Sequence, residues 1–284
     1  MSKIDLGSVG DNCGDHYLPP LNLVYPGGNA VNTAFYARLT GITVSYAGVI
    51  GNDRIGRYIY EQLLEAEVDV SHVKMFPGET GITEIQIENG ERIFATERLG
   101  VQEFFCEDQE LLQFLASHRF VHLSGFTNWP TAPVSLREVT ARIARATAKE
   151  GIPVSIDFSD QPLNNWAFQM ASIIEIGFFS RSEASKKHVL DEIERIYNAG
   201  MNRVVVTRGE KGSLAFDGNI LIDRNAPEIQ VKDTLGAGDS FIGTFLGFYL
   251  QNNSIDKCLE KATAVSAQIC QRVGAWGTPL SLSR

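Results

Sequence analysis

Short apolar runs alternate with longer amphipathic segments along most of the 284 residues of the chain. The apolar runs have the length and composition of buried strands, and they predict strands at residues 4–9, 43–50, 120–123, 154–158, 173–179 and 203–207. The segments between them predict helices at residues 29–40, 55–66, 134–150 and 184–198. Gly41 and Gly151 stand just after two of these helices, where a glycine commonly ends a helix.

This alternation of strands and helices predicts an α/β fold over residues 1–284, read as one domain. We expect a three-layer αβα core in which helices cover both faces of a mostly parallel sheet. Ligands of such sheets bind at the carboxyl ends of the strands, so residues that directly follow a predicted strand are the first candidates for a site.

Residues 83–94 break the alternation and predict a β-hairpin. Polar and apolar residues alternate in both arms, and Asn89-Gly90 between them supplies the two positive-φ positions of a tight turn. This register sets Ile85 opposite Phe94.

A second segment outside the pattern is the extended, proline-containing stretch at residues 16–26. Together with the hairpin, taken as residues 79–99, it predicts a small β lid beside the main sheet. The alternative is that the hairpin forms an edge of the core sheet.

The composition is that of an ordinary globular protein, with 44% hydrophobic and 21% charged residues. The net charge of −9 argues against nucleic acid or an anionic membrane surface as a partner. No long apolar stretch stands near residue 1, so we expect no signal peptide, and the most apolar helical run is too short to span a bilayer. The cysteines, which lack metal-site spacing, are expected to be reduced thiols of a cytoplasmic protein: Cys13, Cys106, Cys258 and Cys270.

The most informative segment, residues 232–241, reads Lys-Asp-Thr-Leu-Gly-Ala-Gly-Asp-Ser-Phe and leads into an apolar helical run. Gly236, Ala237 and Gly238 predict an amide-rich turn at a helix N-terminus, where free N–H groups and the helix dipole bind anions. Asp239 would lie in the first helical turn beside this anion hole, as a general base that takes a proton from an alcohol. The pattern suits phosphoryl transfer to a hydroxyl, although a capped helix without chemistry is the alternative.

Polar residues after the first predicted strand suit a ligand rich in hydroxyl groups. The carboxylate of Asp15 can accept hydrogen bonds from a pair of neighbouring hydroxyls. Gly28 allows close backbone approach, and Asn29 and Asn32 share one face of the first turn of the next helix. Helix capping by Asn29 and a turn role for Asp15 are the structural alternatives.

The string Asp-Thr-x-Gly-Ala-Gly-Asp at residues 233–239 closely resembles the C-terminal signature of the ribokinase-like (PfkB) sugar kinases. The resemblance extends from Gly10 to Gly277. It implies a ribokinase-like fold, Asp239 as catalytic base, ATP and Mg²⁺ as cofactors, and a lid that closes over the sugar and forms a homodimer contact. The need for a monovalent cation stays open.

The resemblance also assigns residues outside the catalytic turn. Asp15, Gly28, Asn29 and Asn32 match the family's sugar contacts. The nucleotide would be bound by a Thr-x-Gly-x-x-Gly loop and by the helix and turn that wall the adenine: Thr207, Gly209, Gly212, Ala262, Ser266 and Gly274.

A metal role is implied for two carboxylates. Glu183 matches the glutamate of the family's Asn-x-x-Glu pair, which organises Mg²⁺ through water, although Ser180 replaces the asparagine. Asp233 would lie near the phosphate and cation site. Asp53, in the family's next signature, is expected to be a helix N-cap. The chain contains no GxxxxGK[ST] motif, which excludes a P-loop kinase at the level of motifs.

Four segments look most like the fructoselysine 6-kinases of this family: residues 10–13, 26–32, 157–160 and 274–276. The implied substrate is the 6-hydroxyl of a fructosamine, the product of lysine glycation, with fructose or ribose as the alternative. A cationic amine in the substrate calls for a carboxylate or an aromatic face nearby, and the candidates are Glu84, Glu97, Trp129 and Asp160.

Two other classes of function stay open at this point. Gly7, Gly10 and Gly14 after the first strand suggest an NAD-dependent oxidoreductase, although their spacing is not G-x-G-x-x-G. A non-catalytic sugar-binding protein could keep the binding motifs, but the intact Asp239 argues against it.

Overall fold

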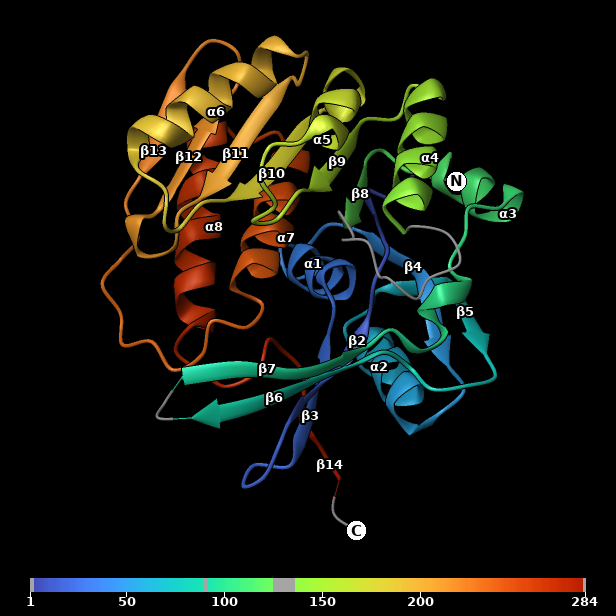
Figure 1. The fold of residues 1–284 in the computed structure, drawn as a ribbon. Coiled ribbons are helices and arrows are strands. Elements are labelled where there is room, and N and C mark those ends of the chain that lie inside the picture. The colour runs from blue at the N-terminus through green and yellow to red at the C-terminus, as the bar shows by residue number, and fades with distance from the viewer. Residues whose placement is uncertain (1–2, 89–90, 125–135, 283–284) are drawn as a thin grey trace.

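The computed structural model describes residues 3–88, 91–124 and 136–282, and a nine-stranded sheet forms its centre (Figure 1). The strand order is β13-β12-β11-β10-β9-β8-β1-β4-β5, parallel from β11 to β5 and antiparallel at the other edge. The strands are β1 (Leu6–Val9), β4 (Val44–Gly51), β5 (Asp69–Phe76), β8 (Val121–Ser124), β9 (Val154–Asp157), β10 (Ile176–Ser180), β11 (Arg203–Thr207), β12 (Ser213–Phe216) and β13 (Leu221–Arg224).

Helices cover both faces of this sheet, which confirms the predicted three-layer core. On one face, the apolar cluster takes side chains from α3 (Gln109–Leu115), α4 (Leu136–Lys149), α5 (Asn165–Met170) and α6 (Lys186–Asn198). The cluster on the other face takes them from α1 (Asn29–Arg38), α2 (Arg54–Glu65), α7 (Ala237–Leu250) and α8 (Ile255–Ile269). Three short 3₁₀ turns complete the described helices: η1 (Gly100–Phe104), η2 (Ala171–Ile173) and η3 (Gly209–Lys211).

A second, five-stranded sheet lies beside the core, below it in Figure 1. Its order is β14-β3-β2-β6-β7, formed by β2 (Cys13–Tyr17), β3 (Leu23–Gly27), β6 (Ile82–Glu88), β7 (Glu91–Arg98) and β14 (Leu280–Ser281). The predicted hairpin is β6–β7, with Ile85 opposite Phe94 as expected, whereas its Asn89-Gly90 turn lies outside the described residues. The hairpin is therefore not an edge of the main sheet. No sequence pattern predicts that β14 joins this second sheet by pairing with β3.

Each predicted strand and helix has a counterpart in the structure, and the differences are at element ends. The strand predicted at 173–179 begins at Ile176, because η2 ends at Ile173 and a bend at Glu175 precedes the strand. The helix predicted at 184–198 begins at Lys186, since the Ser185 hydroxyl accepts the N–H of His188 and caps it. Asp53 caps α2 by accepting the N–H of Gly56, as predicted. The first two residues of the helix predicted at 134–150 lie outside the described residues.

Within the described ranges, no helix combines the length and apolar character needed to cross a bilayer. The most apolar helix, α7, has buried side chains on several faces because it packs between α1 and α8. Gly243 makes its contact with α1 close, since a Cβ at this position would lie 2.5 Å from the carbonyl oxygen of Thr33. The first turns of α1 and α7 are therefore neighbours, and the candidate site forms there.

Candidate functional site

The N-terminus of α7 is the turn that the sequence singled out. Gly236 is its N-cap residue and has a left-handed backbone, with φ of 73°. A Cβ there would lie 2.5 Å from the Cβ of Ala275, so both the conformation and the space favour glycine. Asp239, a half-buried residue, lies in the first turn and shares this end of the helix with the exposed Gly238. The arrangement gives backbone amides and one carboxylate a common place, as predicted.

Two asparagines of α1 hold the Asp239 carboxylate in a fixed orientation. The side-chain amide of Asn29 donates to Oδ1 at 2.8 Å, and that of Asn32 donates to Oδ2 at 2.7 Å. Asn32 is in turn oriented by Trp276, whose indole N–H donates to its Oδ1 at 2.8 Å. Because each oxygen of Asp239 accepts a separate hydrogen bond, the carboxylate cannot rotate freely, yet it keeps lone pairs for a substrate hydroxyl.

Two further carboxylates, those of Asp157 and Asp11, bond to the start of α1 at Asn29, and the sequence motifs predicted a role for neither. The Nδ2 atom of Asn29 also donates to Oδ2 of Asp157, at the end of β9, with a donor–acceptor distance of 2.7 Å. Asp11 follows β1 and accepts the backbone N–H groups of Asn29 and Ala30 at 2.9 and 3.0 Å, so it caps α1. Both residues stand at carboxyl ends of parallel strands, a position that could have marked them as site residues.

Burial and mutual repulsion raise the pKa values of these carboxyl groups. Burial raises the pKa of Asp239 to about 6, and the charge of Asp11 adds to this effect. The pKa of Asp157 rises to about 7, first through burial and then through the charges of Asp239 and Asp11. A carboxyl group with a pKa near 6 is largely ionised at neutral pH and is a stronger base than an ordinary aspartate, which suits proton abstraction.

The predicted sugar contacts come together at this place. Asp15 on β2 is buried, and its carboxyl group accepts the thiol of Cys13 and packs against the backbone of Gly27. Gly28 follows with φ of 101° and lies against the backbone of Asn12. Since α1 starts at the next residue, Asp15, Gly28, Asn29 and Asn32 form one side of the site together with Asp239.

On the other side of the α7 turn, a groove of about 870 Å³ opens between the ends of β10 and β11, α7 and α8. Of the residues predicted for the nucleotide and the catalytic turn, this groove is lined by Thr207, Gly209, Gly212, Ala237, Gly238 and Ser266. Ala262 and Gly274 lie outside its lining: Ala262 is fully buried in the core, and Gly274 packs against the ring of Tyr25.

The two predicted metal residues have different surroundings. Glu183 is exposed and follows Ser182, which lines the groove. Asp233 is buried and accepts the N–H groups of Leu235 and Gly274 and the hydroxyl of Tyr17, so it joins this turn to β2.

Over the residues that the structure describes, no group of three or more His, Cys, Asp or Glu side chains could hold a metal by itself. Mg²⁺ needs no such group, because it is commonly bound through one or two carboxylates, water and the phosphates of a substrate.

Comparisons with known proteins agree with this architecture. The pfkB family of carbohydrate kinases matches residues 19–280. Over 272 residues the chain is 32% identical to fructoselysine 6-kinase from Escherichia coli (strain K12), covering 95% of this chain and 99% of that protein. It is 28% identical to fructosamine kinase FrlD from Bacillus subtilis (strain 168), covering 95% and 92%.

Among solved structures, the Arabidopsis thaliana ribokinase complexed with ribose and ATP aligns with a TM-score of 0.81 at 23% identity. The alignment covers 96% of this chain and 94% of that one, so the fold is ribokinase-like. The oxidoreductase alternative is wrong, because both the family match and the relatives are kinases. The chain belongs to the pfkB family of carbohydrate kinases.

Proposed function

We propose that this carbohydrate kinase uses ATP to phosphorylate the 6-hydroxyl of fructoselysine or a related fructosamine. The relatives from E. coli and B. subtilis support the substrate class, because each aligns over nearly its whole length. The observation that carries the chemistry is the position of Asp239. Two asparagines fix its carboxylate in the first turn of α7. The two residues that precede it in this turn, Ala237 and Gly238, line the groove.

In the proposed reaction, the 6-hydroxyl lies against Asp239 with the γ-phosphate in line behind it. As the hydroxyl oxygen bonds to phosphorus, its proton passes to the Asp239 carboxylate. The bond between the γ-phosphorus and the β–γ bridging oxygen breaks, and ADP leaves with that electron pair. The backbone amides of residues 236–238 stabilise the charge on the transferring group, since they are held at a helix N-terminus.

The groove is proposed to bind ATP, with Thr207, Gly209, Gly212 and Ser266 along its wall. Mg²⁺, when bound, would neutralise phosphate charge and orient the phosphates for transfer. We assign Glu183 to its water shell, and Asp233 to the turn beneath the phosphate and cation site. Ala262 and Gly274 would support the adenine end from behind the lining.

The second sheet is proposed to close over the sugar as a lid. Asp15 would accept hydrogen bonds from ring hydroxyls. Glu84 is a poor partner for the substrate amine, because the register pairs it with His16 and so sets it on the opposite sheet face from Asp15. Glu97 and Asp160 are exposed and stay candidates, whereas Trp129 lies outside the described residues.

The lid is also proposed to form the contact of a homodimer. Ile87, Ile93 and Phe94 on the β6–β7 hairpin are 44–49% exposed, and a second copy would cover such side chains.

The test is a coupled kinase assay with fructoselysine, fructose and ribose. We expect kcat/KM for fructoselysine to exceed that for fructose by at least about tenfold, or about 1.4 kcal/mol of transition-state binding. Equal or better use of fructose or ribose would refute the fructosamine assignment, and the chain would then be a fructokinase or a ribokinase. No sugar-dependent formation of ADP with any substrate would favour a non-catalytic sugar-binding protein.

A further inference from the structure

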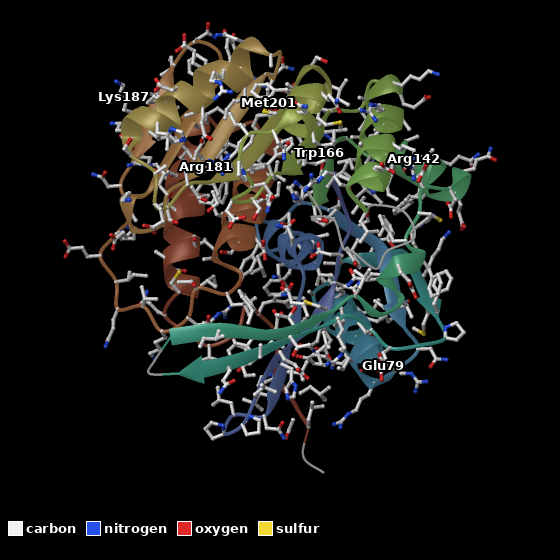
Figure 2. The ribbon with its side chains drawn as sticks, viewed as in Figure 1. Glu79, Arg142, Trp166, Arg181, Lys187 and Met201 are labelled. Carbon is white, nitrogen blue, oxygen red and sulfur yellow. The ribbon has the colours of Figure 1, made fainter. Side chains whose placement is uncertain are left out.

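Arg181, the first residue after β10, is an arginine buried beside the nucleotide groove. Figure 2 shows it inside the molecule, whereas Lys187 and Arg142 extend from the surface. Its side chain is 8% exposed and its guanidinium lies over the ring of Phe179, 5.6 Å from the ring centre. Burying a guanidinium costs free energy unless its N–H groups have hydrogen-bond acceptors and its charge is paired. The partners of Arg181 therefore indicate its role.

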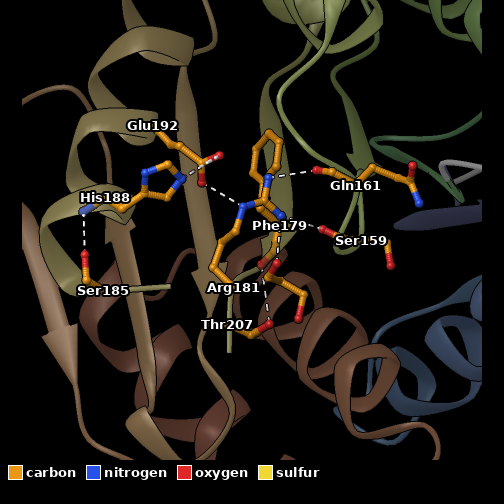
Figure 3. Close-up of polar contacts among 9 residues, drawn as sticks. Ser159, Gln161, Phe179, Arg181, Ser185, His188, Glu192 and Thr207 are labelled. Carbon is orange, nitrogen blue, oxygen red and sulfur yellow. Dashed lines mark hydrogen bonds and ion pairs between the residues drawn. The ribbon is translucent and has the colours of Figure 1, made fainter. Parts of the chain in front are cut away.

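Those partners are one carboxylate and three backbone carbonyls (Figure 3). The Nε atom donates to Glu192 of α6 at 2.7 Å, and the terminal nitrogens donate to the carbonyl oxygens of Ser180, Gln161 and Ser159 at 2.7, 2.8 and 3.3 Å. His188 also contacts Glu192, at 3.7 Å. Only the planar, five-donor group of arginine can reach such a set at once, since the lysine ammonium is a point charge.

Two of the carbonyls belong to the loop that follows Asp157 and β9. Ser159 in this loop has a left-handed backbone, with φ of 53°, which a serine rarely adopts without outside support. Its N–H donates to Oδ1 of Asp157 at 2.7 Å, while its carbonyl accepts from Arg181 and from the N–H of Ser180. The arginine therefore fixes one side of a turn whose other side fixes Asp157, the carboxylate that shares Asn29 with Asp239.

The backbone of the same residue is bonded to the nucleotide side. The N–H of Arg181 donates to the carbonyl oxygen of Thr207 at 2.8 Å, and Ser180, Ser182 and Thr207 all line the groove. One residue thus contacts the loop behind the proposed base through its side chain and the wall of the groove through its backbone.

We propose that Arg181 is a positioning residue for phosphoryl transfer: it sets the Asp157 loop, and through Asn29 the base Asp239, relative to the nucleotide groove. The proposal rests on the proposed kinase reaction but not on the identity of the sugar. Rates of phosphoryl transfer depend steeply on alignment of acceptor and donor, and a displacement of about 1 Å can cost about 100-fold.

The test compares Arg181→Met and Arg181→Lys with Arg195→Met. Arg195 is a matched control, because its guanidinium also lies 5.6 Å from an aromatic ring centre, that of Phe168, but on the outside of α6. We expect Arg181→Met to lower kcat by about 10–100-fold while KM values change little, and Arg181→Lys to lose less. Arg195→Met should keep the wild-type kcat.

The acidic limb of the profile of kcat against pH gives a second test, because a purely structural role of Arg181 would leave the position of this limb unchanged. Burial and the charge of Asp11 raise the pKa of Asp239, and Asn29 opposes this by donating to its carboxylate. A loosened Asp157 loop admits water and frees Asn29 for Asp239 alone. In Arg181→Met the limb should therefore move to lower pH.

The proposal fails if Arg181→Met lowers the melting temperature but leaves kcat and the pH profile unchanged at temperatures well below that melting temperature. If that variant does not fold, Glu192→Gln replaces it, with the exposed Glu194→Gln as control. Glu192→Gln should lower kcat and shift the limb in the same direction, and an unchanged profile would overturn the proposal. Each variant is compared with the wild type on whichever sugar the wild type phosphorylates best, so failure of the fructosamine assignment leaves this test intact.

Discussion

The proposed sugar side of the α7 turn is organised by side chains, whereas the proposed nucleotide side is lined largely by small residues and exposed loops. Asp239 is held by Asn29 and Asn32 through bonds of 2.8 and 2.7 Å, and Asn32 is held by Trp276. Across the turn, the groove of about 870 Å³ has exposed glycines and loop residues along its wall. The proposed base is thus oriented before any substrate binds, whereas phosphates in the proposed nucleotide groove would meet mostly backbone groups.

This difference explains why substitutions should have unequal effects on the two sides. A backbone N–H is present whatever the side chain, so a substitution in the wall of the groove leaves its backbone donors in place. On the sugar side, each oxygen of Asp239 depends on one named amide. Removing a partner there leaves a buried polar group without its hydrogen bond, which costs about 1–3 kcal/mol.

The strongest way to break the comparison is Asp239→Asn. Asparagine keeps the size of the side chain but cannot take a proton, so kcat should fall by about 10²–10⁴-fold. Affinities for ATP and sugar, measured by calorimetry, should stay within a few-fold of the wild type. Turnover close to the wild-type rate would remove Asp239 from the role of base.

A second substitution on the sugar side, Asp15→Ala, should weaken sugar binding rather than chemistry. Loss of a buried, charged hydrogen-bond acceptor costs about 1.5–3 kcal/mol, or one to two decades in the dissociation constant. ATP binding without sugar, measured in parallel, should barely change. If the variant melts earlier but binds sugar as before, Asp15 supports the lid sheet only.

The pH dependence should sharpen the comparison, because the titrating carboxyl groups lie on the sugar side. Asp239 accepts a proton only when ionised, and its pKa is raised to about 6, so kcat/KM should fall as the pH drops through about 6. Asp11→Asn removes the neighbouring negative charge that raises the pKa of Asp239, so the fall should occur at lower pH. A limb at the same pH in both proteins would contradict this electrostatic link.

The smallest effect is expected on the nucleotide side, for Thr207→Val. The Thr207 hydroxyl makes one weak contact, 3.4 Å from the carbonyl oxygen of Phe179, and valine has nearly the same shape. KM for ATP should rise by a few-fold at most, consistent with about 0.5 kcal/mol. A rise of tenfold or more would show that a side chain, and not the backbone, recognises the nucleotide there.

The parts of the fold that could be predicted are those with a local signal. Apolar runs marked the parallel strands, the Asn-Gly pair in the sequence predicted the register of the β6–β7 hairpin, and the Gly-Ala-Gly-Asp string located the α7 turn. The two-residue β14 has no such pattern, because its strand character comes only from pairing with β3.

The polar contacts of the site were harder to predict, because they also join residues far apart in the sequence. Asp157 and Asn29 are 128 positions apart, and nothing near either residue indicates the other. Asp11 lies in the segment 10–13 that resembles the fructoselysine 6-kinases, but its capping of α1 becomes visible only when β1 and α1 are packed together.

The bond from Trp276 to Asn32 spans 244 positions of sequence, and this has a consequence for the nascent chain. During synthesis, α1 and its two asparagines leave the ribosome long before the tryptophan that orients one of them. Until residue 276 has emerged, Asn32 lacks its indole partner and the Asp239 carboxylate lacks a fixed setting. A growing chain of this kind can acquire its strands and helices early, but the proposed base is held as in the folded protein only after residue 276 has been synthesised.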